Sequence, residues 1–183
     1  MSLITDPEVS FLAALARTLE EDYVGKKQAM WVDSPFYWIK TRPSRQVGAI
    51  GEALVSGWVA AKGFDVQKPL NAQHDRIIEG MKVEIKFSTL WTDNSSFKFQ
   101  QIRDQDYEYA FLLGIAPFDA KAWFVPKQEL LYDRVPYLRP QHGESSGKDT
   151  KWLSVPYDDP PAWLDEFGET LSEVRELISA AAT

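Results

Sequence analysis

The chain of 183 residues contains no cysteine and only two histidines, His74 and His142. The absence of cysteine excludes disulfide bonds and thiolate zinc sites, and it is compatible with a reducing cytoplasm, where we expect the protein to reside. Two histidines are also too few for a histidine-rich metal site. Any metal bound by this chain is therefore expected to be a hard ion held by oxygen ligands.

Long hydrophobic runs are missing as well. No apolar stretch approaches the roughly 20 residues that a transmembrane helix requires, and the first residues lack the basic and then apolar pattern of a secretory signal. Hydrophobic residues make up 44% of the chain and charged residues 26%, which is typical of a globular protein. The length predicts a single domain over residues 1–183, and no membrane partner is expected.

The net charge of −7 argues at first against a nucleic-acid partner, but the charges are unevenly distributed. Residues 158–183 hold seven acidic residues and one basic residue, whereas residues 23–103 hold twelve Lys or Arg and seven Asp or Glu. The tail is therefore acidic and the middle of the chain is basic. Because a nucleic acid responds to local charge more than to the total, this asymmetry leaves such a partner open.

Hydrophobic periodicity predicts both helices and strands. Helices are expected over residues 5–24, 44–62 and 161–180, and a short polar helix is expected over residues 97–105. Strands are expected over residues 64–68, 75–78, 81–88, 107–115 and 120–125. Residues 131–161 are rich in proline, glycine and polar residues, which is typical of a long loop. The expected core thus spans about residues 44–126, with the N-terminal helix before it and a C-terminal loop and helix in residues 131–182.

The helix over residues 44–62 is the clearest of these predictions. Ser44 is expected to cap its N-terminus, and Gly63 is expected to end it. Two stripes at helical spacing run along it, and we expect the first to be buried: Val47, Ile50, Leu54, Trp58 and Ala61 in the first, Gly48, Glu52, Val55 and Val59 in the second. Glu52 is thus an acid with apolar neighbours along the helix, which is unusual for a solvated charge.

The chain is organised around the segment from Asp75 to Ser88. Residues 81–88 alternate between apolar and polar, which predicts a strand with Glu84 and Lys86 on one face. Glu79-Gly80 is a plausible two-residue turn before that strand. A hairpin closed there would bring Asp75 back beside Glu84 or Lys86, so that two carboxylates and an ammonium group converge.

Such a group of side chains suits phosphodiester hydrolysis, which requires an attacking water and positive charge at the phosphate. Magnesium supplies much of this and binds in proteins through one or two carboxylates together with waters; manganese can substitute for it. Asp75 and Glu84 fit that ligand set, and the Ile85 carbonyl can add a backbone oxygen. Lys86 would then orient the water or stabilise charge on the phosphate. The alternative is a solvated Glu84–Lys86 pair on an exposed strand.

The arrangement resembles a known family. Asp75, then Glu84-Ile85-Lys86 on a strand, after a helix that carries Glu52, looks like the PD-(D/E)xK nuclease superfamily. The resemblance covers roughly residues 44–125. It implies a restriction-endonuclease-like α/β core, in which a central mixed β-sheet of about five strands is flanked by helices; additional N- and C-terminal helices complete the expected fold.

The resemblance also implies roles for individual residues. Asp75 and Glu84 would be metal ligands, Lys86 the catalytic lysine, and Glu52 the additional acid that the first core helix often supplies. His74 departs from the family pattern, in which proline precedes the aspartate. The tripeptide alone is not specific, because acid-x-lysine also occurs at residues 119–121 and 149–151.

Candidate DNA contacts lie outside this centre. They are basic or amide side chains that can reach phosphates or base edges, or a histidine in a glycine-flanked loop: Arg45, Lys98, Gln101, Arg103, His142 and Lys148. Solvated surface positions explain the same residues.

Taken together, these features predict a magnesium-dependent DNA endonuclease, of which a type II restriction enzyme acting on double-stranded DNA as a homodimer is the most specific form. Two alternatives remain at this point. One is a structure-selective repair or recombination nuclease with the same core. The other is a catalytically inert nucleic-acid-binding subunit of a larger assembly.

Overall fold

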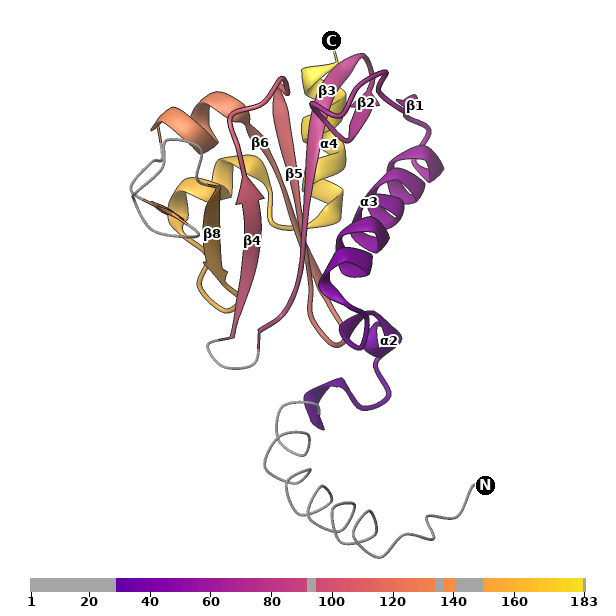
Figure 1. Ribbon diagram of the computed structural model, residues 1–183, viewed down its shortest axis with the longest axis vertical. Coiled ribbons are helices and arrows are strands. Elements are labelled where there is room, and N and C mark those ends of the chain that lie inside the picture. The colour runs from indigo at the N-terminus through magenta and orange to yellow at the C-terminus, as the bar shows by residue number, and fades with distance from the viewer. Residues whose placement is uncertain (1–28, 92–94, 134–136, 141–149, 183) are drawn as a thin grey trace, which may run out of the picture.

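The computed structural model describes residues 29–91, 95–133, 137–140 and 150–182 (Figure 1). The helix expected over residues 5–24 lies outside this part of the chain, as do His142 and Lys148. Of the helices that are described, none is both long enough and apolar enough to span a membrane.

A five-stranded sheet forms the centre of the fold, in the order β1-β2-β3-β5-β6. Its strands are β1 (Val66–Gln67), β2 (Arg76–Ile78), β3 (Met81–Thr89), β5 (Tyr109–Ile115) and β6 (Ala120–Pro126). The pair β3 and β5 is parallel, and the other neighbouring pairs are antiparallel. The α/β class with a mixed five-stranded sheet is therefore confirmed.

A second, three-stranded sheet has the order β4-β8-β7. Its strands are β4 (Ser96–Ile102), β8 (Lys151–Pro156) and β7 (Leu138–Pro140). The short helix predicted over residues 97–105 was thus wrong. Phe97 and Phe99 are buried at a spacing of two, and both rings contact Trp123 of β6, so the segment is an amphipathic strand. The loop predicted over residues 131–161 likewise contains β7 and β8.

The long helix α3 (Ser44–Ala61) packs against β3. Gly63 follows it with a φ of 91°, in the left-handed conformation that glycine adopts easily. The residue that caps the N-terminus is Pro43 rather than Ser44, because Ser44 is already helical and makes no capping hydrogen bond. The first stripe is not the most buried part of the helix. The buried residues of α3 are Gly51, Val55 and Val59, of which Val55 and Val59 belong to the second stripe.

The other helical elements lie at the two ends of the described chain and between β6 and β7. They are a 3-10 turn (Ala29–Trp31), α2 (Tyr37–Lys40), a π-helical turn (Glu129–Asp133), a second 3-10 segment (Ala162–Phe167) and α4 (Leu171–Ala181). The single helix predicted over residues 161–180 is therefore two helices. Gly168, with a φ of 92°, separates them, and a capping box between Thr170 and Glu173 starts α4.

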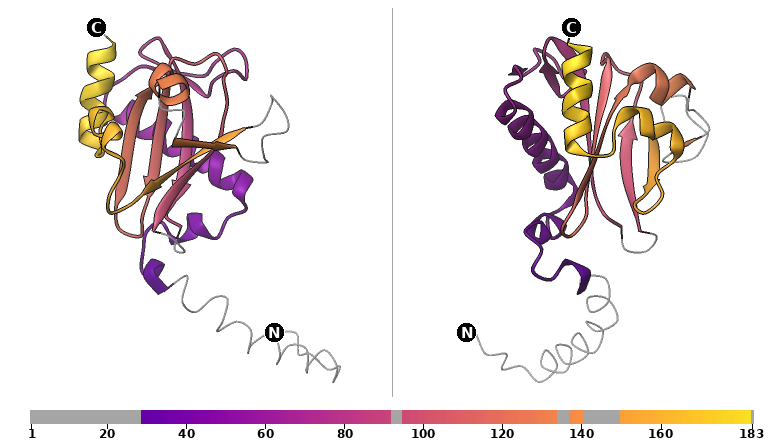
Figure 2. Two further views of the ribbon diagram at one scale, coloured as in Figure 1. Left: turned by 90° about the vertical axis from the view of Figure 1, so that its left-hand side faces the viewer. Right: turned by 180° about the vertical axis from the view of Figure 1, so that it is seen from behind.

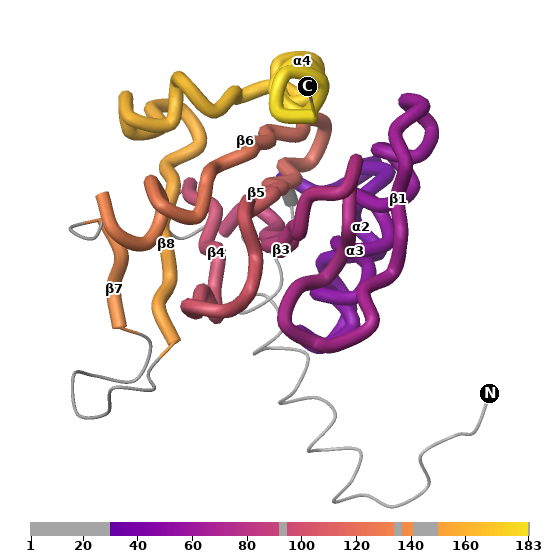
Figure 3. The backbone as a smooth tube through the Cα atoms, turned by 90° about the horizontal axis from the view of Figure 1, so that it is seen from above, coloured from indigo at the N-terminus to yellow at the C-terminus, as the bar shows by residue number. Residues whose placement is uncertain are grey.

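The five-stranded sheet lies between α3 on one face and the three-stranded sheet on the other (Figure 2, Figure 3). Trp58 of α3 contacts Phe111 of β5 on the first face. On the second face, Phe97 and Phe99 of β4 contact Trp123. Both faces of β5 are thus covered, as the nearly continuous apolar run at residues 109–113 predicts.

Candidate active site

The predicted hairpin forms, and it closes at Glu79 and Gly80, whose φ angles are 50° and 80°. Two consecutive residues with positive φ are typical of the two-residue turn that joins antiparallel strands. Just before β2, the Asp75 amide donates a hydrogen bond to the Val83 carbonyl over 3.1 Å. Asp75 therefore lies beside the segment of β3 that carries Glu84, as the sequence predicts.

The Asp75 side chain is fixed to β3 directly. Its Oδ2 accepts a hydrogen bond from the Ile85 amide over 2.7 Å. The strand β2 begins at Arg76, so Asp75 lies just before it. The Asp75 carboxylate takes the position beside β3 that a strand residue would occupy if β2 continued toward the N-terminus. The N–H and C=O of one residue in an extended strand point the same way, so the Ile85 carbonyl also faces the Asp75 side.

Glu84 and Lys86 form an ion pair on the face of β3 that looks toward the three-stranded sheet. The distance from Lys86 Nζ to Glu84 Oε1 is 2.7 Å, and the two side chains are only 14% and 10% exposed. A pair this deeply buried is not a solvated surface pair. It lies on β3 next to the open end of the hairpin.

The surroundings make the carboxyl groups of Glu84 and Glu52 harder to ionise. Burial raises the pKa of Glu84 above its usual value; the Lys86 ammonium opposes this rise, and the Asp75 carboxylate adds to it. Burial also raises the pKa of Glu52, and again the Asp75 carboxylate adds to the rise. Three carboxyl groups therefore influence one another here, and a bound cation would relieve their repulsion.

Glu52 faces the hairpin through Arg76. The Arg76 Nη1 atom lies 3.5 Å from Glu52 Oε2, and Arg76 Nε donates a hydrogen bond to Ser56 Oγ over 2.7 Å. Glu52 and Ser56 are one turn apart on α3. The Arg76 guanidinium contacts both side chains and so connects the helix to the start of β2. Sequence reasoning missed Arg76, whose contacts with α3 are made only in the folded chain.

The oxygen atoms of Asp75, Glu84 and the Ile85 carbonyl are the candidate ligands for a magnesium ion. No group of three or more acidic or histidine side chains in the described ranges is arranged to hold a metal ion. Asp75 Oδ2 and Glu84 Oε1 have hydrogen-bonding partners, whereas the second oxygen of each carboxylate has none among the described residues. Two such oxygens and a backbone carbonyl fit a magnesium ion that keeps several waters. The three-acid set that includes Glu52 is not assembled.

His74, which directly precedes Asp75, is buried, and it lies close enough to Glu84 to influence the pKa of that carboxyl. Its Nδ1 lies 3.0 Å from the Asp106 carbonyl, and its Nε2 makes no hydrogen bond with a described residue. The imidazole therefore connects the start of the hairpin to the segment that leads into β5.

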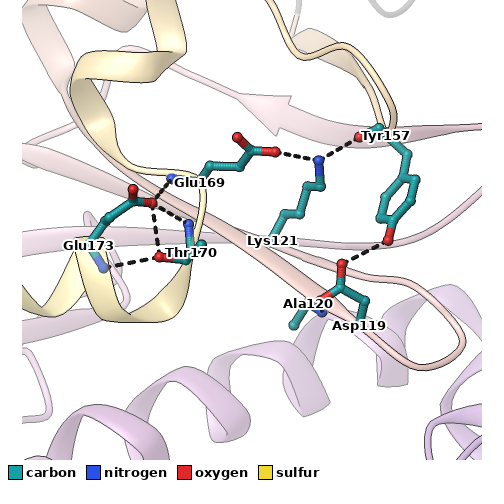
Figure 4. Close-up of polar contacts among 7 residues, drawn as sticks. All are labelled: Asp119, Ala120, Lys121, Tyr157, Glu169, Thr170 and Glu173. Atoms are coloured by element: carbon teal, nitrogen blue, oxygen red, sulfur yellow. Dashed lines mark hydrogen bonds and ion pairs between the residues drawn. The ribbon is translucent and has the colours of Figure 1, made fainter.

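The acid-x-lysine match at residues 119–121 has a different role (Figure 4). Lys121 Nζ forms an ion pair with Glu169 and donates a hydrogen bond to the Tyr157 carbonyl over 2.6 Å. Asp119 accepts a hydrogen bond from the Tyr157 hydroxyl over 2.7 Å, which helps raise the pKa of that hydroxyl to about 12. These contacts connect β6 to the segments after β8 and before α4, so the cluster is structural.

The residues expected to contact DNA are spread over two elements. Lys98 and Gln101 lie on β4, Arg103 directly follows it, and Arg45 lies in the first turn of α3. Gln101, Arg103 and Arg45 are exposed. The structure does not bring these side chains onto the Asp75 hairpin, although the Lys98 amide donates a hydrogen bond to Ser88 Oγ of β3 over 2.9 Å.

No protein-family model matches the chain, and no curated protein matches it either. Among solved structures, the chain is similar to a bacterial homing endonuclease, I-Ssp6803I, with a TM-score of 0.49 and 15% sequence identity. The similarity covers 76% of this chain and 96% of that chain.

Proposed function

We propose that this chain is a metal-dependent endonuclease that hydrolyses phosphodiester bonds of double-stranded DNA. The observation that carries the proposal is the convergence of Asp75, Glu84 and Lys86 at the open end of one hairpin. The two acids repel each other in a partly buried place, and a lysine lies next to them. That combination suits a divalent cation and an anionic substrate together.

In this proposal, Asp75 and Glu84 hold the ion through their carboxylates, and the Ile85 carbonyl adds a third oxygen. Glu52 supplies further negative charge that favours a cation at this place, and Arg76 keeps it turned toward the hairpin. Magnesium, when bound, supplies positive charge at the scissile phosphate and activates a water; manganese can substitute for it.

Lys86 has a role that depends on its contact with Glu84. In the absence of a cation, the Lys86 ammonium is neutralised by the Glu84 carboxylate at 2.7 Å. With a cation held by Glu84, the Lys86 ammonium would be free to orient the attacking water and to stabilise negative charge on the phosphate. The lysine therefore acts on the substrate only when the acids hold their ion.

The finer form of the proposal is a restriction-type enzyme that acts in the cytoplasm as a homodimer, because two centres are needed to cut both strands at once. A structure-selective nuclease is the other form that the same site allows. Wild-type protein is incubated with plasmid DNA and magnesium, and in parallel with branched DNA. Discrete plasmid fragments favour the first form, and cutting restricted to branched DNA favours the second.

The test of the site compares wild type with Asp75→Asn and Lys86→Ala. Asp75→Asn is expected to abolish cleavage and Lys86→Ala to slow it by about 10²-fold or more, while each protein stays folded. Cleavage that is unchanged in both would overturn the assignment. A wild type that neither cleaves DNA nor shows a magnesium-dependent rise in melting temperature would instead favour an inert binding subunit.

A further inference from the structure

The three-stranded sheet differs from the rest of the chain in its charge. Its strands contain Lys98 in β4, Arg139 in β7 and Lys151 in β8, and they contain no acidic residue. The whole chain nevertheless has a net charge of −7. Since these strands carry only basic charges in a chain that is acidic as a whole, this sheet is a place in the described structure where an anionic partner can be attracted.

One face of this sheet is turned away from the core. Phe97, Phe99 and Leu153 are buried against the five-stranded sheet. Lys98 lies opposite Ser154, and Arg139 lies opposite Trp152. Because side chains alternate along a strand, these four residues occupy the outer face. We call the set of Lys98, Arg139, Trp152 and the neighbouring Trp91 the basic face.

Lys98 is held in position on the basic face by aromatic rings. Its Nζ lies 4.0 Å from the centre of the Trp91 ring and 5.6 Å from that of Trp152. No carboxylate of a described residue forms an ion pair with this ammonium. Cation–π contacts orient a lysine without cancelling its charge, so the charge remains available to a ligand.

The basic face begins close to the candidate active site. The Lys98 amide donates a hydrogen bond to Ser88 Oγ over 2.9 Å. Ser88 and Lys86 lie on the same face of β3, two residues apart, which corresponds to about 7 Å along a strand. The segment of β4 that carries Lys98 therefore lies beside the strand of the candidate active site, while the Lys98 side chain lies on the outer side of the three-stranded sheet.

We propose that the basic face binds the phosphate backbone of duplex DNA beside the point of cleavage. The proposal rests on the proposed function, to which it adds a binding surface. Basic side chains on the outer face of a sheet fit a duplex, whose backbone supplies closely spaced phosphates. Trp91 and Trp152 add flat surfaces beside those phosphates.

Binding of the full-length chain to a labelled duplex of mixed sequence is measured over a series of salt concentrations, in a chelator so that no cleavage occurs. Lys98→Gln and Arg139→Gln are each expected to weaken binding several-fold and to reduce the slope of log affinity against log salt by about 1. Lys98→Arg is expected to keep the wild-type slope. Lys62→Gln, which removes the same charge from the exposed end of α3, is the matched control and is expected to bind as wild type does.

The outcomes separate this proposal from the proposed function. If the wild type cleaves DNA while Lys98→Gln and Arg139→Gln bind with the wild-type slope, the basic face is overturned and the nuclease stands. If the predicted losses occur in a protein that never cleaves, the basic face stands and the nuclease fails. A wild type that binds single strands but no duplex overturns the assignment of duplex DNA.

Discussion

Asp75 and Ile85 are joined by a hydrogen bond in which the Ile85 amide donates to Asp75 Oδ2 over 2.7 Å. The same carboxylate that we propose as a metal ligand therefore also takes part in the architecture of the hairpin. Removing it has two consequences, one for stability and one for chemistry. Substitutions that differ in only one of these respects can separate them.

Asp75→Ala is expected to lower the free energy of unfolding by about 1–3 kcal/mol, because the Ile85 amide loses its acceptor. Asp75→Asn is expected to lose much less, since its amide oxygen can accept the same hydrogen bond. Both variants are expected to lose magnesium-dependent cleavage. Chemical denaturation measures the first effect, and a plasmid assay measures the second. Equal stability losses in the two variants would show that the hydrogen bond is not what differs between them.

Lys86→Ala is expected to reduce the cleavage rate by about 10²-fold or more, which is typical of losing a positioned catalytic group. It leaves the Glu84 carboxylate buried without its cation, so some stability is lost as well. Lys121→Ala is the matched control, because it removes a lysine from another acid-x-lysine match that has a structural role. That variant is expected to unfold more easily and yet to cleave at the wild-type rate at temperatures where it is folded. Loss of activity to the same extent in both variants would contradict a catalytic role for Lys86 and a structural role for Lys121.

Stability is expected to depend on pH through Glu84. Burial raises the pKa of this carboxyl in the folded protein above its ordinary value of 4.5, so the folded state binds the proton more tightly than the unfolded state does. The stabilising contribution is complete below the ordinary value and is lost as the pH rises through the raised one. The glutamine in Glu84→Gln cannot ionise, so this variant does not lose stability at that position as the pH rises.

The measurement is the free energy of unfolding of both proteins from acid to neutral pH, without divalent cations. The difference between them is expected to shift in favour of Glu84→Gln as the pH rises. The attraction between Lys86 and the ionised Glu84 carboxylate opposes this shift, and it already acts on the pKa of Glu84. Two parallel curves would contradict a raised pKa at this position.

Gly51 is expected to tolerate no side chain. A Cβ built there would lie 2.2 Å from the Phe87 Cβ, so α3 could not keep its distance from β3. Gly51→Ala is expected to destabilise the fold by about 1–3 kcal/mol through overpacking. Gly57→Ala, on the same helix with no atom within 4 Å of the added Cβ, is the control and is expected to stabilise by about 0.5–1 kcal/mol. Thermal or chemical denaturation of both variants tests the pair, and a stable Gly51→Ala would show that α3 can move.

The hairpin and the main sheet could be predicted from the sequence because their signals are local. The alternation at residues 81–88 gives a strand, and Glu79-Gly80 gives a tight turn with a fixed register. That register decides what lies beside Glu84, so the contact of Asp75 with β3 follows from a few adjacent residues. The uniform apolar run at residues 109–113 likewise indicates a strand covered on both sides.

The three-stranded sheet could not be predicted in the same way. β4 pairs with β8, which follows it by about fifty residues, so neither strand has a local partner that would reveal it. Polar residues between Phe97 and Ile102 also hide the alternation, and a register shift after Phe99 interrupts it. The role of Arg76 could not be predicted for a related reason. Its contacts with α3 depend on how the helix crosses the sheet.

The connection from β3 to β5 carries β4, whereas β8, the strand that pairs with β4, comes from beyond β6. The strands of the two sheets therefore alternate along the chain, so no single cut in the chain separates one sheet from the other. A fragment that stops at Pro126 would retain the hairpin but would leave β4 with no hydrogen-bonding neighbour. Its unpaired edge would be free to join another molecule, so such a fragment is expected to aggregate even though it contains every residue of the candidate active site.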